Sequence, residues 1–390
     1  MTDVFLIEPP RSAAWFPFGD SRPLSEMRAG VWLIRERWEA IGEGEVRAVF
    51  APAHLRDFAE DGVPSFVERK SVKGPALIGR SDFAPSGTRP ELPERPARLT
   101  HEQDTVGWWV PAGHAWEGDH EDWPSLELEG LLLRGAFDLV TALEHLLHAD
   151  AMDFTVERGD PVPDGCTIIG DPADVVLLGA SVEPGVVFDV REGAVVVERR
   201  AYVKAGSRLE GPVYIGLGTE VLGGSIRWTS LGPRCKVRGE ISTSVFVGFA
   251  NKAHDGFVGH SVIGRWVNLG AGTITSNLKN TYGKVRLQVG ATIMETERQY
   301  LGSLLGDHAK TAIGTLLGTG TAVGTGANVF GEVRPPKYVP PFAWGSTGDQ
   351  CVELAGFLTV AERVMGRREV AMTEPVRAML ERIYREAAKP

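Results

Sequence analysis

The stretch from residue 259 to 280, GHSVIGRWVNLGAGTITSNLKN, places Ile263, Leu269 and Thr275 six residues apart. An α-helix repeats its buried face roughly every 3.6 residues and a strand about every two, so neither explains a step of six. In a hexapeptide-repeat β-helix, each triangular coil has three short strands and every sixth residue points into a shared core. The stretch therefore predicts a parallel β-helix.

The same step recurs on both sides of this stretch. Extending it backwards gives Val245, Asn251 and Phe257, and other sets with this spacing are Ile215 with Val221, Leu231 with Val237, and the run Leu305, Thr311, Leu317, Val323, Val329. Glycine is often the next residue, which suits the tight corners between short strands. Repetition on this scale makes the β-helix the main structural prediction.

The chain divides into three predicted regions: an α/β domain over 1–160, the β-helix over 161–345 and a short helical extension over 346–390. In the first region, apolar runs predict strands at 4–8, 46–50, 76–78 and 106–110, and apolar stripes predict helices around 31–41 and 139–147. Alternation of this kind favours a mainly parallel sheet. The remaining predictions are an extended surface loop at the proline-rich segment 81–100, a wrap across the end of the solenoid at 333–345, and helices at 361–367 and 374–387.

Composition excludes several classes of protein. The 41 basic and 51 acidic residues argue against nonspecific binding to a nucleic-acid backbone. The three cysteines are widely spaced and form no C-x-x-C pair, so neither a disulfide framework nor a zinc site is indicated. The N-terminus lacks the features of a signal peptide, and no segment approaches the roughly 20 apolar residues of a membrane span. We therefore expect a cytoplasmic protein with no membrane partner.

Two motifs carry a resemblance to a known family. The segments KAHDGFVGHSVIG (252–264) and VNLGAGTITSNLKN (267–280) resemble the catalytic coil of bacterial N-acetylglucosamine-1-phosphate uridyltransferases, which are bifunctional enzymes with an acetyltransferase β-helix. The segments PFGDSRPLSEMRAGVWLIRERWE (17–39) and GDHAKTAIGTLLGTGTAVG (306–324) are closer still to a divergent sugar nucleotidyltransferase branch. This resemblance implies a left-handed β-helix, a homotrimer, and acyl-CoA sites between neighbouring solenoids.

The resemblance also assigns roles in acyl transfer from acetyl-CoA to a sugar amine. It makes His254 the general base, with Asp255 a candidate to orient the imidazole, and Asn277 a group that holds the acceptor amine. It gives Asn268 and Lys284 contacts with the sugar and its phosphate, and Lys252 and Lys310 are weaker candidates for the substrate site. One departure is Phe257, which stands where the family has a substrate-binding tyrosine.

Each of these residues also has a purely structural interpretation. Asparagines at the corners of a β-helix often stack or bond to backbone groups, which would account for Asn268 and Asn277 without a ligand. A histidine in a coil can likewise be a packing residue, although the offset of His254 from the GAGTITSN coil favours a functional role. The two interpretations remain open at this point.

The α/β domain is expected to bind a nucleotide, with Mg²⁺ if it is active. In the family, a glycine-rich loop after the first strand cradles the phosphates, whereas here no glycine stands between VFLIE and Arg11. Arg11, Arg22 and Arg28 are the candidates for the basic residues of that site, and Arg35 and Arg37 are predicted to be salt-bridged helix residues. The missing loop argues against catalytic competence.

Three functional hypotheses follow from the sequence. The leading one is a sugar-phosphate transferase of nucleotide-sugar metabolism, with acyl-CoA-dependent transfer in the β-helix. The alternative is a noncatalytic trimeric scaffold or regulator that binds a sugar nucleotide, which the missing glycine-rich loop and Phe257 favour. A third, a β-helix metalloenzyme, requires His254, His260 and His308 to converge between coils and subunits.

Overall fold

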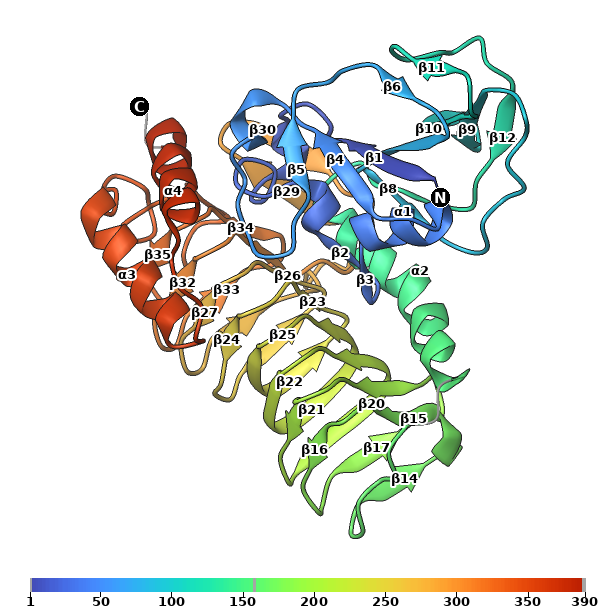
Figure 1. Ribbon diagram of the computed structural model, residues 1–390. Coiled ribbons are helices and arrows are strands. Elements are labelled where there is room, and N and C mark those ends of the chain that lie inside the picture. The colour runs from blue at the N-terminus through green and yellow to red at the C-terminus, as the bar shows by residue number, and fades with distance from the viewer. Residues whose placement is uncertain (1, 157–158, 388–390) are drawn as a thin grey trace.

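The computed structural model describes residues 2–156 and 159–387. An α/β domain is followed by a parallel β-solenoid and then by two C-terminal helices (Figure 1). The predicted fold class is confirmed. None of the helices in these two ranges is long and apolar enough to cross a membrane.

The α/β domain contains a seven-stranded mixed sheet with the order β12-β9-β10-β7-β1-β4-β5. Strands β7, β1, β4 and β5 run parallel, while β10 is antiparallel to both of its neighbours. Their bounds are β1 Asp3–Ile7, β4 Val46–Phe50, β5 Ser65–Val67, β7 Ala76–Arg80, β9 Ala97–His101, β10 Asp104–Val110 and β12 Ser125–Glu127. The predicted parallel core is thus extended by an antiparallel half.

Two helices cover this domain. In α1 (Ile34–Gly42) the predicted apolar stripe is buried, and Trp38 lies directly over Gly79 of β7, where a Cβ atom would come within 2.4 Å of its ring. The second helix, α2 (Asp138–Asp153), buries its leucines between the domain and the solenoid and packs against β20 and β21 (Figure 1). This helix therefore joins the two regions.

The proline-rich segment 81–100 is not wholly a surface loop, so that prediction was wrong in part. Residues Phe83–Pro85 form β8, which pairs with β13 (Gly130–Leu132), and the side chain of Phe83 is fully buried. The apolar Phe-Ala pair ahead of the prolines explains the difference, because it inserts into the core beneath α1. Two further small sheets pair β2 (Arg28–Ala29) with β3 (Trp32–Leu33) and β6 (Val72–Lys73) with β11 (Ala115–Trp116).

The solenoid strands stack in three parallel columns, one for each face of the coil. The first contains β14 Thr167–Ile169, β17 Val187–Asp189, parts of β20 Ser207–Ile215, β21 Glu220–Leu231 and β22 Lys236–Ser242, then β25 Phe257–Gly259, β28 Ile274–Thr275 and β33 Leu316–Leu317. The second contains β15 Val175–Leu177, β18 Val195–Val197, the ends of β20 and β21, then β23 Val245–Phe246, β26 Val262–Ile263, β31 Ser303–Leu305, β34 Thr321–Val323 and β36 Tyr338–Val339. The third contains β16 Ser181–Val182, β19 Tyr202–Val203, the starts of β21 and β22, then β24 Asn251–Lys252, β27 Asn268–Leu269, β32 Lys310–Thr311 and β35 Asn328–Val329.

The register of the coils corrects the backward extension of the six-residue step. Phe246 pairs with Ile263, which lies 17 residues later rather than 18. The inward residues of this coil are therefore Phe246, Lys252 and Val258, all fully buried, and not the predicted set Val245, Asn251 and Phe257. The step of six holds from Ile263 to Thr275 and from Leu305 to Val329. It shifts by one residue in the coil before Ile263, where a corner is shorter.

Between β28 and β31 the chain leaves the solenoid. Val262 pairs with Leu304, 42 residues later, and the excursion holds an antiparallel hairpin of β29 (Arg286–Val289) and β30 (Thr292–Glu295). Val285, Leu287 and Leu301 from this insertion join the same apolar core as α1 and α2. The insertion therefore fastens the solenoid to the α/β domain.

The C-terminal region packs against the last coil. Segment 333–345 was predicted to wrap across the end of the solenoid, but it supplies β36 and a bridge between Trp344 and Asn328, and so extends the stack. Helices α3 (Leu354–Gly366) and α4 (Glu374–Ala387) pack on it through Phe342, whose ring lies 5.0 Å from Phe357 and 4.9 Å from Tyr384. The second helix was predicted at its observed bounds, and the first begins earlier.

Candidate functional site

The predicted base, His254, lies on the corner between β24 and β25. This corner, residues 253–256, is exposed at His254 and ends at Gly256, which has a φ of +137°. Asp255 forms an ion pair with Arg238, with 2.9 Å between its carboxylate and Nε. The acidic neighbour predicted to orient the imidazole is thus engaged elsewhere, and the imidazole faces solvent.

Lys252 occupies the interior of the same coil. Its side chain has no exposed surface, and its Nζ donates hydrogen bonds to the carbonyl oxygens of Arg238 and His254. Burial lowers the pKa of Lys252 to about 8, and Asp255 acts in the opposite direction. Lys252 therefore does not reach a ligand outside the solenoid, and it contacts the backbone of the His254 corner instead.

Asn277 lies one coil further along, at the other end of the same face. Its Nδ2 donates to Nδ1 of His260 over 2.8 Å, and a Cβ atom on Gly259 would meet both the Phe257 ring and this Nδ2. Phe257 and Asn277 therefore lie together over Gly259, on the face that begins at the His254 corner.

His260 belongs to this group, although no role in acyl transfer was predicted for it. Its ring stacks on Tyr300 at 5.1 Å, and its Nε2 is 4.0 Å from the carboxylate of Glu144 in α2. Burial and then the positive charges of Arg298 and Arg227 lower the pKa of His260 to about 4. The imidazole is consequently neutral at physiological pH, and its contact with Asn277 is the signal that links it to the site.

The other predicted substrate residues are spread over the third face and the insertion. Asn268 accepts a hydrogen bond of 2.8 Å from Asn251 in the preceding coil, which is the corner-stacking arrangement of the structural interpretation. Lys310 pairs with Asn268 in register and donates to the carbonyl oxygen of His308 over 2.9 Å; burial lowers its pKa to about 8. Lys284 lies exposed on the insertion and is paired with Glu297.

Exposed apolar side chains lie along the coils that follow the His254 corner. The corners stack through backbone hydrogen bonds from Gly272 to Asp255 and from Gly314 to Ala271. Along these stacked corners and the adjoining strand, three large apolar residues are exposed: Ile274 at 42%, Val333 at 62% and Ile313 at 80%. Apolar surface of this kind on one edge is typical of a face that packs against another protein surface.

A cleft lies in the α/β domain, at the carboxyl ends of β1, β4 and β7. It measures about 560 Å³ and includes Pro9, Pro10 and Pro52 beside charged residues. Ligands of open α/β sheets usually bind at this edge. Its arginines are already paired with carboxylates, namely Arg56 with Glu68, Arg69 with Asp119 and Arg80 with Asp82.

The segment after β1 offers few donors for a phosphate. Pro9 and Pro10 have no backbone N–H, and the N–H of Glu8 donates to Phe50 within the sheet edge. The carboxylate of Glu8 accepts hydrogen bonds from the backbone of Leu24 and Ser25, while burial raises its pKa. A backbone cradle of the kind that binds triphosphates is thus not formed by residues 8–10.

The three arginines predicted to contact the nucleotide have different environments. Arg11 is half exposed and pairs with Asp20 at 2.5 Å. Arg28 is buried, donates to the carbonyl oxygen of Val31 and lies over the ring of Tyr214. Of the three, Arg11 has the most exposed side chain and lies nearest to solvent.

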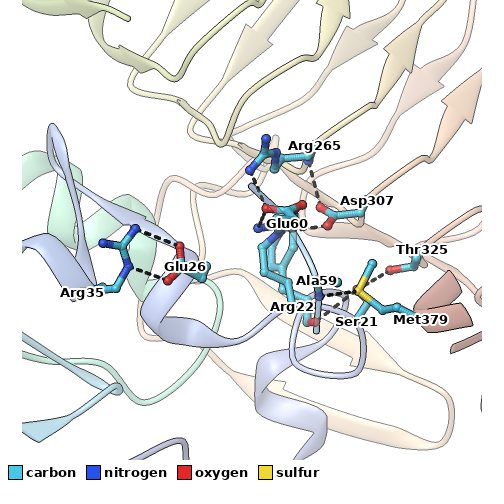
Figure 2. A network of polar contacts seen from close by, with 11 residues as sticks. Ser21, Arg22, Glu26, Arg35, Ala59, Glu60, Arg265, Asp307, Thr325 and Met379 are labelled. Atoms are coloured by element: carbon cyan, nitrogen blue, oxygen red, sulfur yellow. Dashed lines mark hydrogen bonds and ion pairs between the residues drawn. The ribbon is translucent and has the colours of Figure 1, made fainter. Parts of the chain in front are cut away.

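Arg22 lies at the junction between the α/β domain and the solenoid (Figure 2). Its guanidinium is 1% exposed and donates to Asp307 over 2.9 Å and to Glu60 over 2.5 and 3.0 Å. Arg265 of the solenoid also binds Glu60. Burial acts to raise the pKa of Glu60, but the two arginines lower it overall. This junction network already satisfies the charge of Arg22.

The three histidines of the metalloenzyme hypothesis do not assemble in one chain. His254 is exposed on a corner, His260 stacks on Tyr300, and His308 is buried beside Phe357. Over residues 2–156 and 159–387, no group of three or more histidine, cysteine or acidic side chains is placed to hold a metal ion.

Comparison with known proteins supports the resemblance seen in the motifs. No protein-family model matches the chain. A bifunctional sugar-1-phosphate nucleotidylyltransferase/acetyltransferase of Sulfurisphaera tokodaii is 34% identical over 91 residues, which is 23% of either chain. Two proteins named bifunctional protein GlmU are also similar: that of Methanococcus vannielii is 35% identical over 22% of this chain and 20% of its own, and that of Methanocaldococcus jannaschii is 33% identical over 22% and 21%.

These matches confirm the resemblance to the bifunctional nucleotidyltransferase/acetyltransferase family. They span less than a quarter of each relative, so they identify a shared segment rather than a shared whole. The name of the Sulfurisphaera tokodaii protein describes a nucleotidyltransferase and acetyltransferase of sugar 1-phosphates, which agrees with the class of protein predicted from the motifs.

Proposed function

We propose that this protein is a sugar-phosphate transferase of nucleotide-sugar metabolism whose β-helix moves an acyl group from acyl-CoA, with acetyl-CoA as the donor, to the amine of a sugar phosphate. The observation that carries the proposal is the exposed His254 on the corner that leads into the face of Phe257 and Asn277. Amine acylation requires a base that takes a proton from the attacking nitrogen, and His254 is an exposed candidate for that base.

In this reaction His254 takes a proton from the sugar amine as the nitrogen attacks the thioester carbonyl. The tetrahedral intermediate then collapses, the carbon–sulfur bond breaks, and the leaving thiolate takes up a proton to give free CoA and the amide. Asn277 orients the amine, and Phe257 in place of a tyrosine gives the acceptor an apolar contact. Asn268, Lys284 and Lys310 lie on the third face and the insertion, where they would meet the sugar phosphate or the donor.

The active assembly is a homotrimer in this proposal. The support is the exposed apolar set Ile274, Ile313 and Val333, which lies along the same corners as His254. A neighbouring solenoid packed on these residues would close the site on its open side and exclude water from the thioester. Acyl-CoA would then bind between two copies.

The test is a thiol-release assay with acetyl-CoA against a panel of amino-sugar phosphates. We expect His254→Ala to lower kcat by about 10² to 10⁴, the usual contribution of a general base, while the protein remains folded. The matched control is His114→Ala, which removes an exposed histidine of the α/β domain and should leave turnover unchanged. Full activity of His254→Ala would eliminate this residue as the base.

A second candidate function is a noncatalytic scaffold that binds a sugar nucleotide in the α/β domain. The prolines after β1 and the paired arginines of the cleft favour it over a competent nucleotidyltransferase. The same panel decides between the two functions, because a wild-type protein that releases no thiol with any acceptor, yet binds a nucleotide in calorimetry, would be the scaffold.

A further inference from the structure

Lys252 occupies a position that is otherwise apolar or neutral along the whole third column. In register with it, before and after, are Val203, Val221, Val237, Leu269, Thr311 and Val329. All of these side chains point into the solenoid core and are at most 5% exposed. A valine or leucine would therefore satisfy the packing at position 252, and the lysine needs another explanation.

The ammonium group reaches from the interior to the corner that carries His254. A Cβ atom on Gly256 would lie 3.3 Å from Nζ, so the ammonium sits directly beneath this corner. Nζ donates to the carbonyl oxygen of His254 itself and, over 3.2 Å, to that of Arg238 in the preceding coil. One charged group thus joins the His254 corner to the corner below it.

Hydrogen bonds from a charged donor are stronger than neutral ones, and burying an ammonium is costly unless it is bonded. The charged groups facing this corner are Asp255 and Arg238, which pair with each other outside the coil, so Lys252 binds backbone carbonyls rather than a carboxylate. The two carbonyl oxygens belong to successive coils of the solenoid. A lysine that binds both therefore restrains the His254 corner relative to the coil before it.

We propose that Lys252 is a positioning residue that fixes the backbone of the His254 corner, so that the imidazole is held over the face of Phe257 and Asn277. The effect of Lys252 on turnover rests on the acyl transfer proposed above, whereas its effect on the backbone of the His254 corner does not. Separate experiments test the two effects.

The first experiment compares hydrogen exchange in wild type, Lys252→Met and Lys236→Met. Methionine keeps an unbranched side chain, one atom shorter, and removes the charge. Lys236 is the control because it lies in the preceding coil of the same column but pairs with Glu220 outside the core. The amides of Glu240 and Gly272, which donate to the corner carbonyls of Gly256 and Asp255, report on this corner. We expect their exchange to rise roughly tenfold in Lys252→Met only. Unchanged exchange would overturn the proposal whether or not the protein is an acyltransferase.

The second experiment measures kcat and KM in a double-mutant cycle with His254→Ala. Lys252→Met should lower kcat roughly 100-fold with little change in KM, as expected when a catalytic group is displaced. In the His254→Ala background the same change should cost nothing further, because the lysine acts through the histidine. An equal loss in both backgrounds would show a structural role without positioning. If wild type shows no turnover, the proposed function fails and the exchange result alone decides the role of Lys252.

Discussion

At the scale of single residues, Lys252 makes stability depend on pH in the alkaline range. Its pKa is about 8 in the folded protein and ordinarily 10.5, so the unfolded chain holds the proton more tightly. Protonation therefore penalises folding below pH 8, and the penalty disappears as the pH rises from 8 to 10.5. The shift corresponds to about 3 kcal/mol.

We expect the free energy of unfolding of wild type to increase relative to Lys252→Met between pH 8 and 10.5, by up to this amount. Urea titrations of both proteins at the two pH values measure the difference. Lys310, whose pKa is also about 8, is present in both proteins and cancels. A difference that stays constant across this range would show that Lys252 is not desolvated in the folded protein.

The fate of the predicted site residues shows what a sequence reveals at this scale. His254 and Asn277 were located by their offsets within one motif, and their placement on one face follows from the regular coil. Lys252 was a weaker candidate for the substrate site, and Arg22 was a candidate for a basic residue of the nucleotide site. Their burial depends on a shortened coil in one case and on a tertiary junction in the other, and neither is encoded in local spacing.

At the scale of elements, the hairpin of β29 and β30 holds the solenoid against the α/β domain. Leu287 on β29 is 1% exposed and belongs to the core shared with α1 and α2. Leu287→Ala should lower the free energy of unfolding by about 2–5 kcal/mol, as for other buried leucines. The control, Ile293→Ala, removes a side chain that is 61% exposed on the same hairpin. It should change the free energy of unfolding by less than about 0.5 kcal/mol. If the two variants lost the same amount of stability in denaturant titrations, the hairpin would not hold the two regions together.

Element prediction succeeded where one period governs a segment. The apolar runs placed β1, β4, β7 and β10, the stripe of leucines placed α2, and the step of six placed the coils after Ile263. The insertion 276–301 could not be predicted, because its hairpin is short and its buried residues face another domain. Segment 81–100 was misread for a related reason, since two apolar residues among prolines acquire a core only in the folded domain.

At the scale of the whole molecule, the junction network ties the regions together. Arg22→Ala leaves Glu60 and Asp307 without this partner in a buried setting, and we expect a loss of about 3–5 kcal/mol in the free energy of unfolding. Arg11→Ala, which removes an exposed arginine paired with Asp20, is the control and should change it by less than about 0.5 kcal/mol. Calorimetry on Arg22→Ala tests the earlier assignment as well, because unchanged nucleotide affinity would count against Arg22 as a phosphate contact.

Assembly belongs to the same scale. Ile313 is 80% exposed on the corner stack that carries His254, so Ile313→Asp should convert a trimer to monomers and abolish acyl transfer. Ile293→Asp places the same charge on the hairpin and should leave the trimer intact. Mass photometry measures both variants, and a wild type that is monomeric at micromolar concentration would refute the proposed assembly.

The lysine inside the coil has one more consequence, for the accuracy of folding. Successive turns of a solenoid are nearly interchangeable, so a chain that pairs one whole turn out of register still buries its apolar side chains. Such an error costs little free energy. A slip that moved Lys252 away from the carbonyls of Arg238 and His254 would strand a charge in the interior at a cost of several kcal/mol. One charged side chain in a repetitive core thus distinguishes one turn from its neighbours, and that turn is the one that bears His254.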